Sequence, residues 1–402
     1  MKIPELLAPA GNMEKLKIAV HYGADAVYLG GKSFGLRNLA GNFSVSELAE
    51  AADYAHSRGV KVYLTLNAFP ANSDFSHLQD YLSEISPIPL DAYIVADPGV
   101  IDLVREISPG MELHLSTQAN TVNWRSALFW QKQGIRRINL AREMSLAEIS
   151  ETAGRVELEL EAFVHGAMCI SYSGRCLLSS VMSGRNANKG ECSHPCRWGY
   201  ALVEETRPGE YFPVFEDESG TFIFNSRDLC LIEHLPELAA AGVSSLKIEG
   251  RMKGINYVGA VIRVYREALD RLAAEGDAYR FRPEWLEELY KISHRGYTTG
   301  FAFGAPLNVG QEYDSRYIRS HEFVGVVESV GEDGTAVIAV RNQIKSGDTI
   351  EWLGRGMRLG VMQQVELLDL DSAPLEVANP NSRIRLKPSF PAEQHDLLRK
   401  AR

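Results

Sequence analysis

The sequence contains no run of about 18 uncharged apolar residues, which is the length that a membrane-spanning helix requires. Its first residues, MKIPELLAPAGN, also lack an apolar stretch of signal-peptide length. We therefore expect a cytoplasmic protein with no membrane partner. Only 5 of the 402 residues are cysteines. Because thiols stay reduced in the cytoplasm, we do not expect these cysteines to form a disulfide framework.

An excess of positive charge is also lacking, since 52 Asp and Glu outnumber 42 Lys and Arg and the formal net charge is −10. This balance argues against broad, non-specific binding of nucleic acid but leaves room for a local basic groove. No Gly-x-Gly-x-x-Gly fingerprint follows the first predicted strand, which disfavours an open, doubly wound dinucleotide-binding sheet. No His-Glu-x-x-His motif occurs either, so the commonest zinc-peptidase signature is missing.

What is present is a repeated unit in which a short apolar strand ends in polar residues or glycine and a helix follows. In the helix predicted over residues 46–57, Leu48, Ala51, Ala52 and Ala55 share one face. Eight such units with parallel connections predict a (β/α)8 barrel of the TIM type. The eight strands are predicted at 6–10, 26–30, 61–67, 92–97, 112–118, 137–142, 159–165 and 245–251.

The pattern changes after the eighth strand. A long helix is predicted over 255–274, and a stretch rich in Gly and Thr follows it. From about residue 318 apolar and polar residues alternate with period two, which predicts a small antiparallel β-barrel. We therefore predict a barrel over 1–280, a linker over 281–317 and a β-barrel domain over 318–390. A cysteine-rich insertion over 167–220 would lie at the C-terminal face of the first barrel, where active sites of this fold are found.

Four cysteines lie in this insertion, and a fifth, Cys230, follows it. The surrounding residues are mostly Ser, Gly and Asn, and a bound metal would organise such a loop. Thiolates suit Zn²⁺ or an iron–sulfur cluster. The irregular spacing favours a [4Fe–4S] cluster, with zinc as the alternative and buried structural cysteines as a third interpretation. On spacing alone, either Cys196 or Cys230 could be the fourth ligand beside Cys169, Cys176 and Cys192.

The segment EAFVHGAMCISYSGRCLLS, residues 161–179, closely resembles the signature of the collagenase-like peptidase family, peptidase family U32. The segments SRDLCLIEHLPEL, SLKIEGRMK and RGYTTGF fit this family too, and the resemblance spans roughly residues 3–305. It implies a [4Fe–4S] cluster on Cys169, Cys176, Cys192 and Cys230. In some members a pattern closer to Cys192 with Cys196 applies, and this sequence keeps both options.

The resemblance also carries expectations about function. The length and the single small C-terminal domain look most like the prephenate-dependent tRNA uridine 5-hydroxylation proteins of this family. They imply an enzyme that forms 5-hydroxyuridine at position 34 of tRNA, with prephenate as co-substrate. The alternatives are a collagenase-like peptidase, a non-catalytic cluster-bearing scaffold for another hydroxylase, and a relative that acts in rRNA or ubiquinone hydroxylation. A cysteine nucleophile paired with His165 would serve a peptidase, but metal ligation would consume the thiolate.

Polar residues that close the barrel strands are the natural catalytic set. They are Asn67, Asp97, Gln118, Arg142, His165 and the Glu249–Arg251 pair. His165 is the best single general acid or base, because histidine titrates near neutral pH. Glu161 needs a cation nearby, which Lys247 or Arg251 could supply. We predict catalytic roles for His165, Glu161, Glu249 and Arg251, and cofactor binding by Arg142 and Lys247.

Further basic residues are predicted at the same face, where they could bind prephenate carboxylates or RNA phosphates. A structural ion pair or a solvated surface charge is the alternative for each of them. This set comprises Arg142, Arg175, Arg185, Lys189, Arg197, Arg251 and Lys253.

Overall fold

The computed structural model describes residues 2–34, 41–168, 178–183, 193, 202–203, 211–212, 215–217, 220–222, 227–304 and 320–402. The chain forms two compact units. The first contains residues 1–16, 25–252 and 294–317, and the second contains residues 17–24, 253–293 and 318–402. Within the described ranges, no helix has the length and apolar run needed to cross a bilayer.

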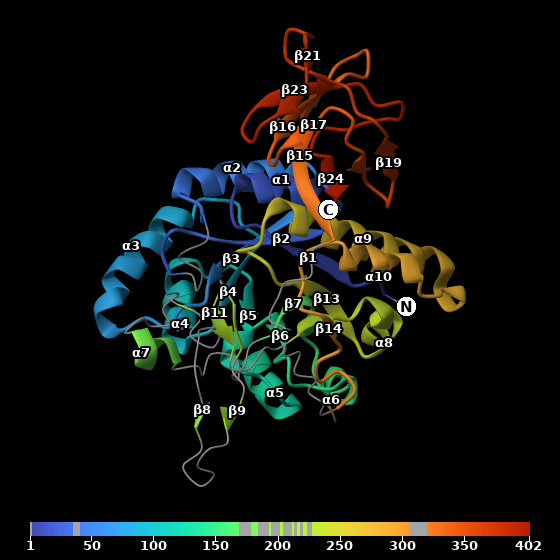
Figure 1. Ribbon diagram of the computed structural model, residues 1–402. Coiled ribbons are helices and arrows are strands. Elements are labelled where there is room, and N and C mark those ends of the chain that lie inside the picture. The colour runs from blue at the N-terminus through green and yellow to red at the C-terminus, as the bar shows by residue number, and fades with distance from the viewer. Residues whose placement is uncertain are drawn as a thin grey trace. The chain divides into compact units, whose positions relative to one another are not determined.

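The first unit is a closed barrel of eight parallel strands with helices outside, which confirms the predicted fold class (Figure 1). Strand β13 closes the barrel because it pairs in parallel with both β1 and β7. Each observed strand overlaps a predicted one. The strands are β1 (Glu5–Pro9), β2 (Ala26–Gly30), β3 (Lys61–Leu66), β4 (Ala92–Val95), β5 (Leu113–Leu115), β6 (Arg137–Asn139), β7 (Glu159–Ala167) and β13 (Val243–Ile248).

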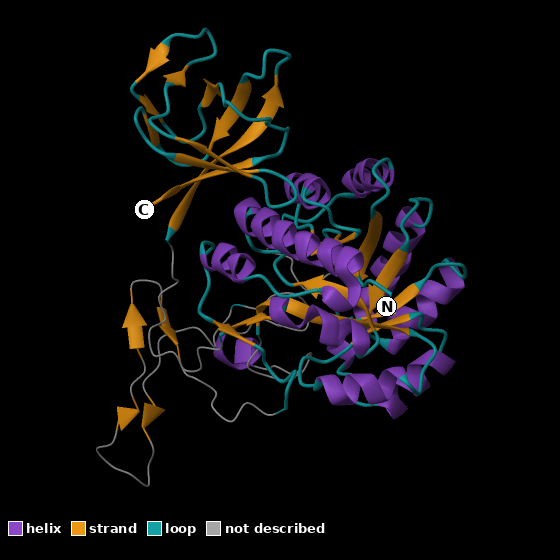
Figure 2. Cartoon of the chain, turned by 90° about the vertical axis from the view of Figure 1, so that its right-hand side faces the viewer, coloured by secondary structure: helices purple, strands orange, loops and turns teal. Residues whose placement is uncertain are grey.

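Helices pack outside this barrel, as the purple ribbons around the strands in Figure 2 show. In α2, the residues Leu48, Ala51, Ala52 and Ala55 are buried, as the sequence periodicity predicts. Ser44 caps this helix, because its side chain accepts a hydrogen bond from the backbone N–H of the third helical residue. The helices of the barrel are α2 (Val45–His56), α3 (Phe75–Ile85), α4 (Pro98–Ile107), α5 (Trp124–Lys132), α6 (Leu146–Ala153) and α8 (Leu235–Ala240), while α1 (Met13–His21) is shared between the two units.

Two short strands extend the barrel sheet beside β7. Strand β12 (Asp228–Cys230) pairs antiparallel with the C-terminal end of β7, and β14 (Tyr297–Thr298) pairs in parallel with β12. The insertion between β7 and β12 contains α7 (Leu178–Ser183) and two hairpins, β8 (Leu202–Val203) with β9 (Tyr211–Phe212) and β10 (Phe215–Asp217) with β11 (Gly220–Phe222).

The second unit combines two helices with an antiparallel half-barrel. Its helices are α9 (Ile255–Glu275) and α10 (Pro283–Tyr290). Both α10 and β14 lie inside the stretch predicted as a linker, and β24 extends the sheet past residue 390. In sheet order, the eight strands are β19 (Leu359–Met362), β18 (Ile350–Leu353), β24 (Leu397–Ala401), β15 (His321–Val330), β16 (Ala336–Val340), β23 (Arg383–Leu386), β20 (Leu367–Leu368) and β21 (Pro374–Leu375). A separate pair is formed by β17 (Ile344–Lys345) and β22 (Val377–Ala378).

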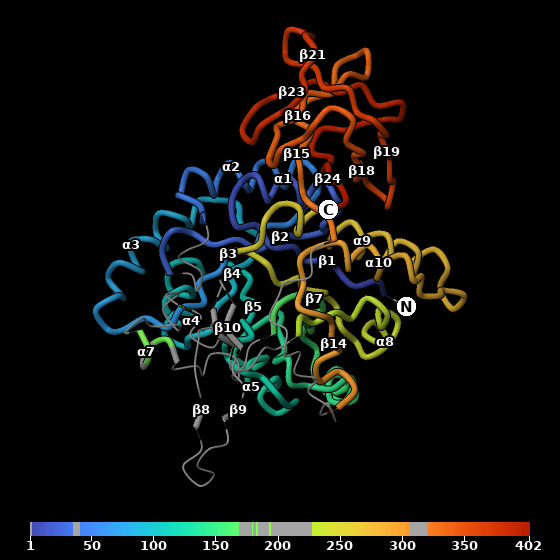
Figure 3. Tube along the Cα trace, in the orientation of Figure 1, coloured from blue at the N-terminus to red at the C-terminus, as the bar shows by residue number. Residues whose placement is uncertain are grey.

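A buried charge cluster holds α9 and α10 to this sheet within the second unit. The two carboxylate oxygens of Glu288 accept hydrogen bonds from Arg263 of α9 and Arg399 of β24. Arg399 also binds Glu351 of β18 at 2.7 Å. All four side chains are tied into one network, so the helix pair and the sheet form one compact unit. Figure 3 traces α9, α10 and the strands of this unit.

Candidate functional site at the barrel mouth

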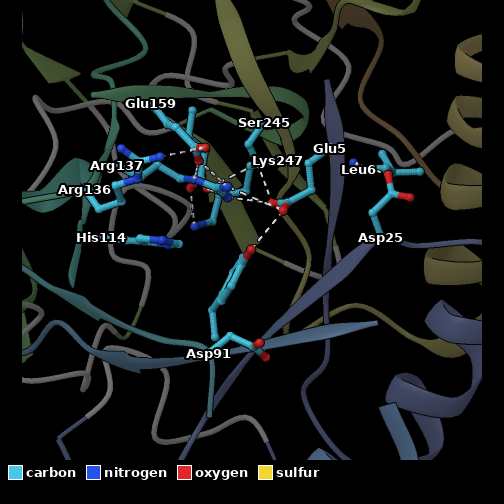
Figure 4. Close-up of polar contacts among 12 residues, drawn as sticks. Glu5, Leu6, Asp25, Asp91, His114, Arg136, Arg137, Glu159, Ser245 and Lys247 are labelled. Carbon is cyan, nitrogen blue, oxygen red and sulfur yellow. Dashed lines mark hydrogen bonds and ion pairs between the residues drawn. The ribbon is translucent and has the colours of Figure 1, made fainter. Parts of the chain in front are cut away.

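The interior of the barrel carries charge on one side, where aliphatic residues usually fill this fold. Arg137 at the start of β6 binds Glu159 at 2.6 Å and also pairs with Glu5 of β1 (Figure 4). Tyr63 donates a hydrogen bond to Glu5 at 2.8 Å. These residues occupy the N-terminal ends of their strands, so this network closes the bottom of the barrel. In this fold, residues at the N-terminal ends of the strands contribute to the stability of the barrel rather than to catalysis.

The predicted carboxylate Glu161 lies one layer higher and is buried. Its Oε1 accepts a hydrogen bond from Lys247 Nζ at 2.8 Å, and its Oε2 lies 3.6 Å from Arg137. Burial alone would raise the pKa of Glu161, but the charges of Lys247 and Arg137 lower it overall. The carboxylate is therefore held ionised. Of the two cations proposed as its partner, Lys247 pairs with Glu161, whereas Arg251 makes other contacts.

Lys247, predicted to bind a cofactor, is enclosed rather than open to the mouth. Its ammonium lies 4.5 Å from the centroid of the Tyr28 ring in addition to its contact with Glu161. Burial lowers the pKa of Lys247, and the charge of Glu161 opposes this shift. The pair is thus a neutralised unit inside the barrel.

Arg251 lies just past the C-terminal end of β13 and is buried. Its guanidinium donates hydrogen bonds to Thr65 of β3 and to Asn42. Gly30 makes room for it, because a Cβ at Gly30 would lie 2.8 Å from the guanidinium carbon. Arg251 therefore connects the loop after β13 to β3 and to the segment before α2 that contains Asn42. This is a positioning role at the mouth.

The C-terminal end of β7 brings two of the predicted residues together. Cys230 on β12 is the register partner of His165 on β7, and both are buried. Because paired residues of antiparallel strands project to the same face, the thiol and the imidazole share one side of the sheet. Strand β11, which precedes Cys230 in the chain, pairs with β10 in a separate hairpin. Cys230 instead reaches the mouth on β12.

A second group of polar and aromatic side chains lies at this edge and was not predicted from the sequence. Asp228 on β12 binds Arg295 at 2.8 Å, and both side chains are buried. Next to them, the ring of Tyr297 stacks on the ring of His294, with their centroids 4.7 Å apart. The centroid of the Tyr297 ring also lies 5.4 Å from that of the His165 ring. Residues 228–230 and residues 294–298 are thereby joined beside β7. The only sign of this group in the sequence is that Asp228 and Arg295 each lie in a short charged motif.

Three further predicted residues lie around the same rim. Arg142 is half-buried, and its guanidinium carbon lies 3.9 Å from the centroid of the Phe163 ring. Glu249 is half-buried, and its backbone N–H donates to the carbonyl of His165 at 2.9 Å. Asp97 accepts hydrogen bonds from Gly99 and Val100 at the start of α4, so it caps a helix.

Several predicted residues lie outside the described part of the chain. They are Cys169, Cys176, Cys192, Cys196, Arg175, Arg185, Lys189 and Arg197. Among the residues that the structure does describe, no three His, Cys, Asp or Glu side chains gather as a metal site. The ligand set therefore stays a prediction, with Cys230 the one candidate ligand whose place is described.

Comparison with known proteins gives matches along most of the chain. The profile of a family described as "Peptidase family U32" matches residues 11–311, and that of its C-terminal domain matches residues 319–399. The chain is 44% identical over 355 residues to "tRNA hydroxylation protein P1" of Bacillus subtilis, covering 88% of this chain and 84% of that protein.

Two other relatives have different names. An "uncharacterized protease" of Methanocaldococcus jannaschii is 37% identical, and the match covers 96% of this chain and 95% of that protein. The "23S rRNA 5-hydroxycytidine C2501 synthase" of Escherichia coli is 34% identical, with 87% of this chain but only 52% of that protein covered.

Proposed function

The chain belongs to peptidase family U32, and from this premise we propose that it is an enzyme of tRNA hydroxylation. The observation that carries the proposal is its 44% identity to a tRNA hydroxylation protein over most of both chains. The rRNA-modifying relative has about half of its length outside the match, so it supports an rRNA substrate less well.

The proposed reaction is 5-hydroxylation of uridine at position 34 with prephenate as co-substrate. Adding a hydroxyl group to a pyrimidine is a two-electron oxidation, so the reaction also consumes an oxygen donor and a two-electron acceptor, and zinc has no redox chemistry. This favours a [4Fe–4S] cluster over zinc in the same thiolate set. Cys169, Cys176, Cys192 and Cys230 would hold the cluster, with Cys196 as the alternative to Cys230. When bound, it would supply electron transfer at the barrel mouth.

The chain's own residues would bind and orient the substrates. Prephenate carries two carboxylates, and a guanidinium is the best side chain for holding one. Arg142 is the suitable group, because it lies half-buried at the rim with its guanidinium over the Phe163 ring, whereas the side chains of Arg251 and Lys247 are buried. His165 lies beside Cys230 and could move a proton at the edge of the site.

Peptidase activity is the second candidate, and it is favoured by the strand register of Cys230 and His165, which places a thiol and an imidazole on the same side of the sheet. The two proposals make opposite demands on Cys230. A cluster ligand holds its thiolate on iron, whereas a nucleophile needs it available for attack.

The proposal is tested with the full chain purified anaerobically. The protein is incubated with tRNA and cell extract from a strain that lacks the gene, so that the extract supplies the oxygen donor and the electron acceptor. Prephenate is added or omitted, and the nucleosides are analysed by mass spectrometry. The expected result is 5-hydroxyuridine that depends on both protein and prephenate. A protein that leaves uridine unchanged but cleaves denatured collagen would overturn the proposal in favour of the peptidase.

A further inference from the structure

Helix α5 carries a stripe of exposed basic and aromatic side chains. Arg125, Phe129 and Lys132 follow one another at spacings of four and three residues, which places them on one helical face. All three are exposed, and the Phe129 side chain is 55% accessible. A phenyl ring this open between two cations is not explained by the packing of the barrel.

The start of the same helix presents a second aromatic ring. The guanidinium carbons of Arg125 and Arg155 lie 4.6 and 4.5 Å from the centroid of the Trp124 ring. Arg155, which follows α6, also pairs with Glu151 at 2.9 Å. Helices α5 and α6 lie side by side (Figure 1). The two arginines and the indole therefore form one continuous patch.

Charge supports the same interpretation independently. No Asp or Glu occurs between Glu112 and Glu143, although the chain has 52 acidic residues among 402. Arg125, Lys132 and Arg136 are all exposed in this interval. Arg136 lies 4.0 Å from Glu159, and this is a loose contact. In a chain with a net charge of −10, a helix whose exposed face carries cations and no acidic residue is suited to a polyanion.

We propose that this α5 face, defined by Trp124, Arg125, Phe129, Lys132 and Arg155, is a contact surface for the tRNA substrate. The inference rests on the proposed function and adds where the RNA lies. Unpaired bases stack on aromatic rings and on guanidinium planes, while lysine and arginine bind the phosphates. Helix α5 begins after the C-terminal end of β5, on the mouth side of the barrel, so RNA on this face can continue into the site.

The tests use the full chain and an unmodified tRNA transcript, with affinity measured between 50 and 200 mM salt. The R125E/K132E variant is expected to bind at least about tenfold more weakly, and its salt slope should fall by about two. F129A should weaken binding by about tenfold, because one base loses its stacking partner. F129Y should keep wild-type affinity, whereas F129L should not, since leucine preserves apolar area but provides no ring.

A matched control exists on α2. Arg58 lies 3.8 Å over the ring of Tyr54, and this helix also contains Glu47, Glu50 and Asp53. The Y54A/R58E variant makes the same kinds of change on an acidic helix and should leave tRNA affinity unchanged. Circular dichroism would verify that every variant keeps its helical content.

The outcomes separate the surface from the function. If wild-type protein binds and hydroxylates tRNA while R125E/K132E and F129A behave like it, the surface assignment is overturned and the proposed function stands. If wild-type protein binds no tRNA, both are overturned. A wild-type dimer that R125E/K132E converts to monomer, with tRNA affinity unchanged, would show that the face binds a second copy and would also overturn the assignment.

Discussion

Cys230 on β12 and His165 on β7 are direct register partners at the C-terminal end of the barrel. This pairing places one candidate iron ligand and the candidate proton carrier on the same side of the sheet. It also explains how a cysteine that follows the insertion can return to the site, because β12 pairs antiparallel with β7.

The pairing predicts which cysteine completes the cluster. Replacing Cys230 with alanine should remove most of the iron, because three thiolates hold a [4Fe–4S] cluster poorly. Iron per chain and visible absorbance after anaerobic purification measure this. The matched variant Cys196→Ala should keep its iron. The reverse result, with iron lost only from the Cys196 variant, would assign the fourth ligand to Cys196.

The buried Glu161–Lys247 pair predicts a large effect on stability. Glu161→Gln leaves the ammonium of Lys247 in a buried place without its charge partner, which should cost about 3–5 kcal/mol. Urea unfolding of the full chain measures the change. The double variant E161L/K247M removes both charges and should recover most of the loss. A single variant as stable as wild type would show that the pair carries little energy.

The second unit should lose stability in acid through Glu288. Burial alone would raise the pKa of Glu288, but Arg399 and Arg263 lower it to about 2. The folded state therefore binds its proton at lower pH than the unfolded state. The stabilisation, about 3 kcal/mol, is complete above about pH 4.5 and disappears as the pH falls towards 2.

Thermal unfolding from pH 6 to pH 2.5 tests this prediction. Glu288→Gln should lower the midpoint at pH 6 and reduce its dependence on pH, whereas Glu332→Gln, at an exposed turn, should change neither. Parallel pH curves for wild type and Glu288→Gln would contradict the assignment.

Gly30 should be intolerant of a methyl group. A Cβ at this position would lie 2.8 Å from the guanidinium carbon of Arg251, so Arg251 must move and give up its bonds to Asn42 and Thr65. Gly30→Ala should therefore destabilise the protein by about 2 kcal/mol and reduce tRNA hydroxylation. Gly110→Ala, where no atom lies within 4 Å, provides the control. Equal urea midpoints for the two variants would remove the proposed role of Arg251.

Much of the barrel could be predicted because its strands are local apolar patterns with polar ends. The face of α2 formed by Leu48, Ala51 and Ala55 follows from spacing alone. The ion pair of Glu161 with Lys247 was also within reach, since both lie at known places on predicted strands. The helix α10 was not foreseen, because eight residues with Gly and Thr nearby resemble a linker.

The Asp228–Arg295 pair could not be predicted in the same way. The two residues are 67 positions apart, and β12 joins β7 antiparallel while β14 joins β12 in parallel. Such pairing depends on how the chain returns from the insertion, which no local periodicity encodes. Likewise, Asp97 reads as a catalytic carboxylate at a strand end, yet its oxygen caps α4.

The most direct test of tRNA hydroxylation is mass spectrometry of tRNA nucleosides from a strain that lacks this gene. We predict that 5-hydroxyuridine and its derivatives disappear and that the wild-type gene restores them, whereas the Cys230→Ala gene does not. Nucleosides that are the same with and without the gene would contradict the proposed function.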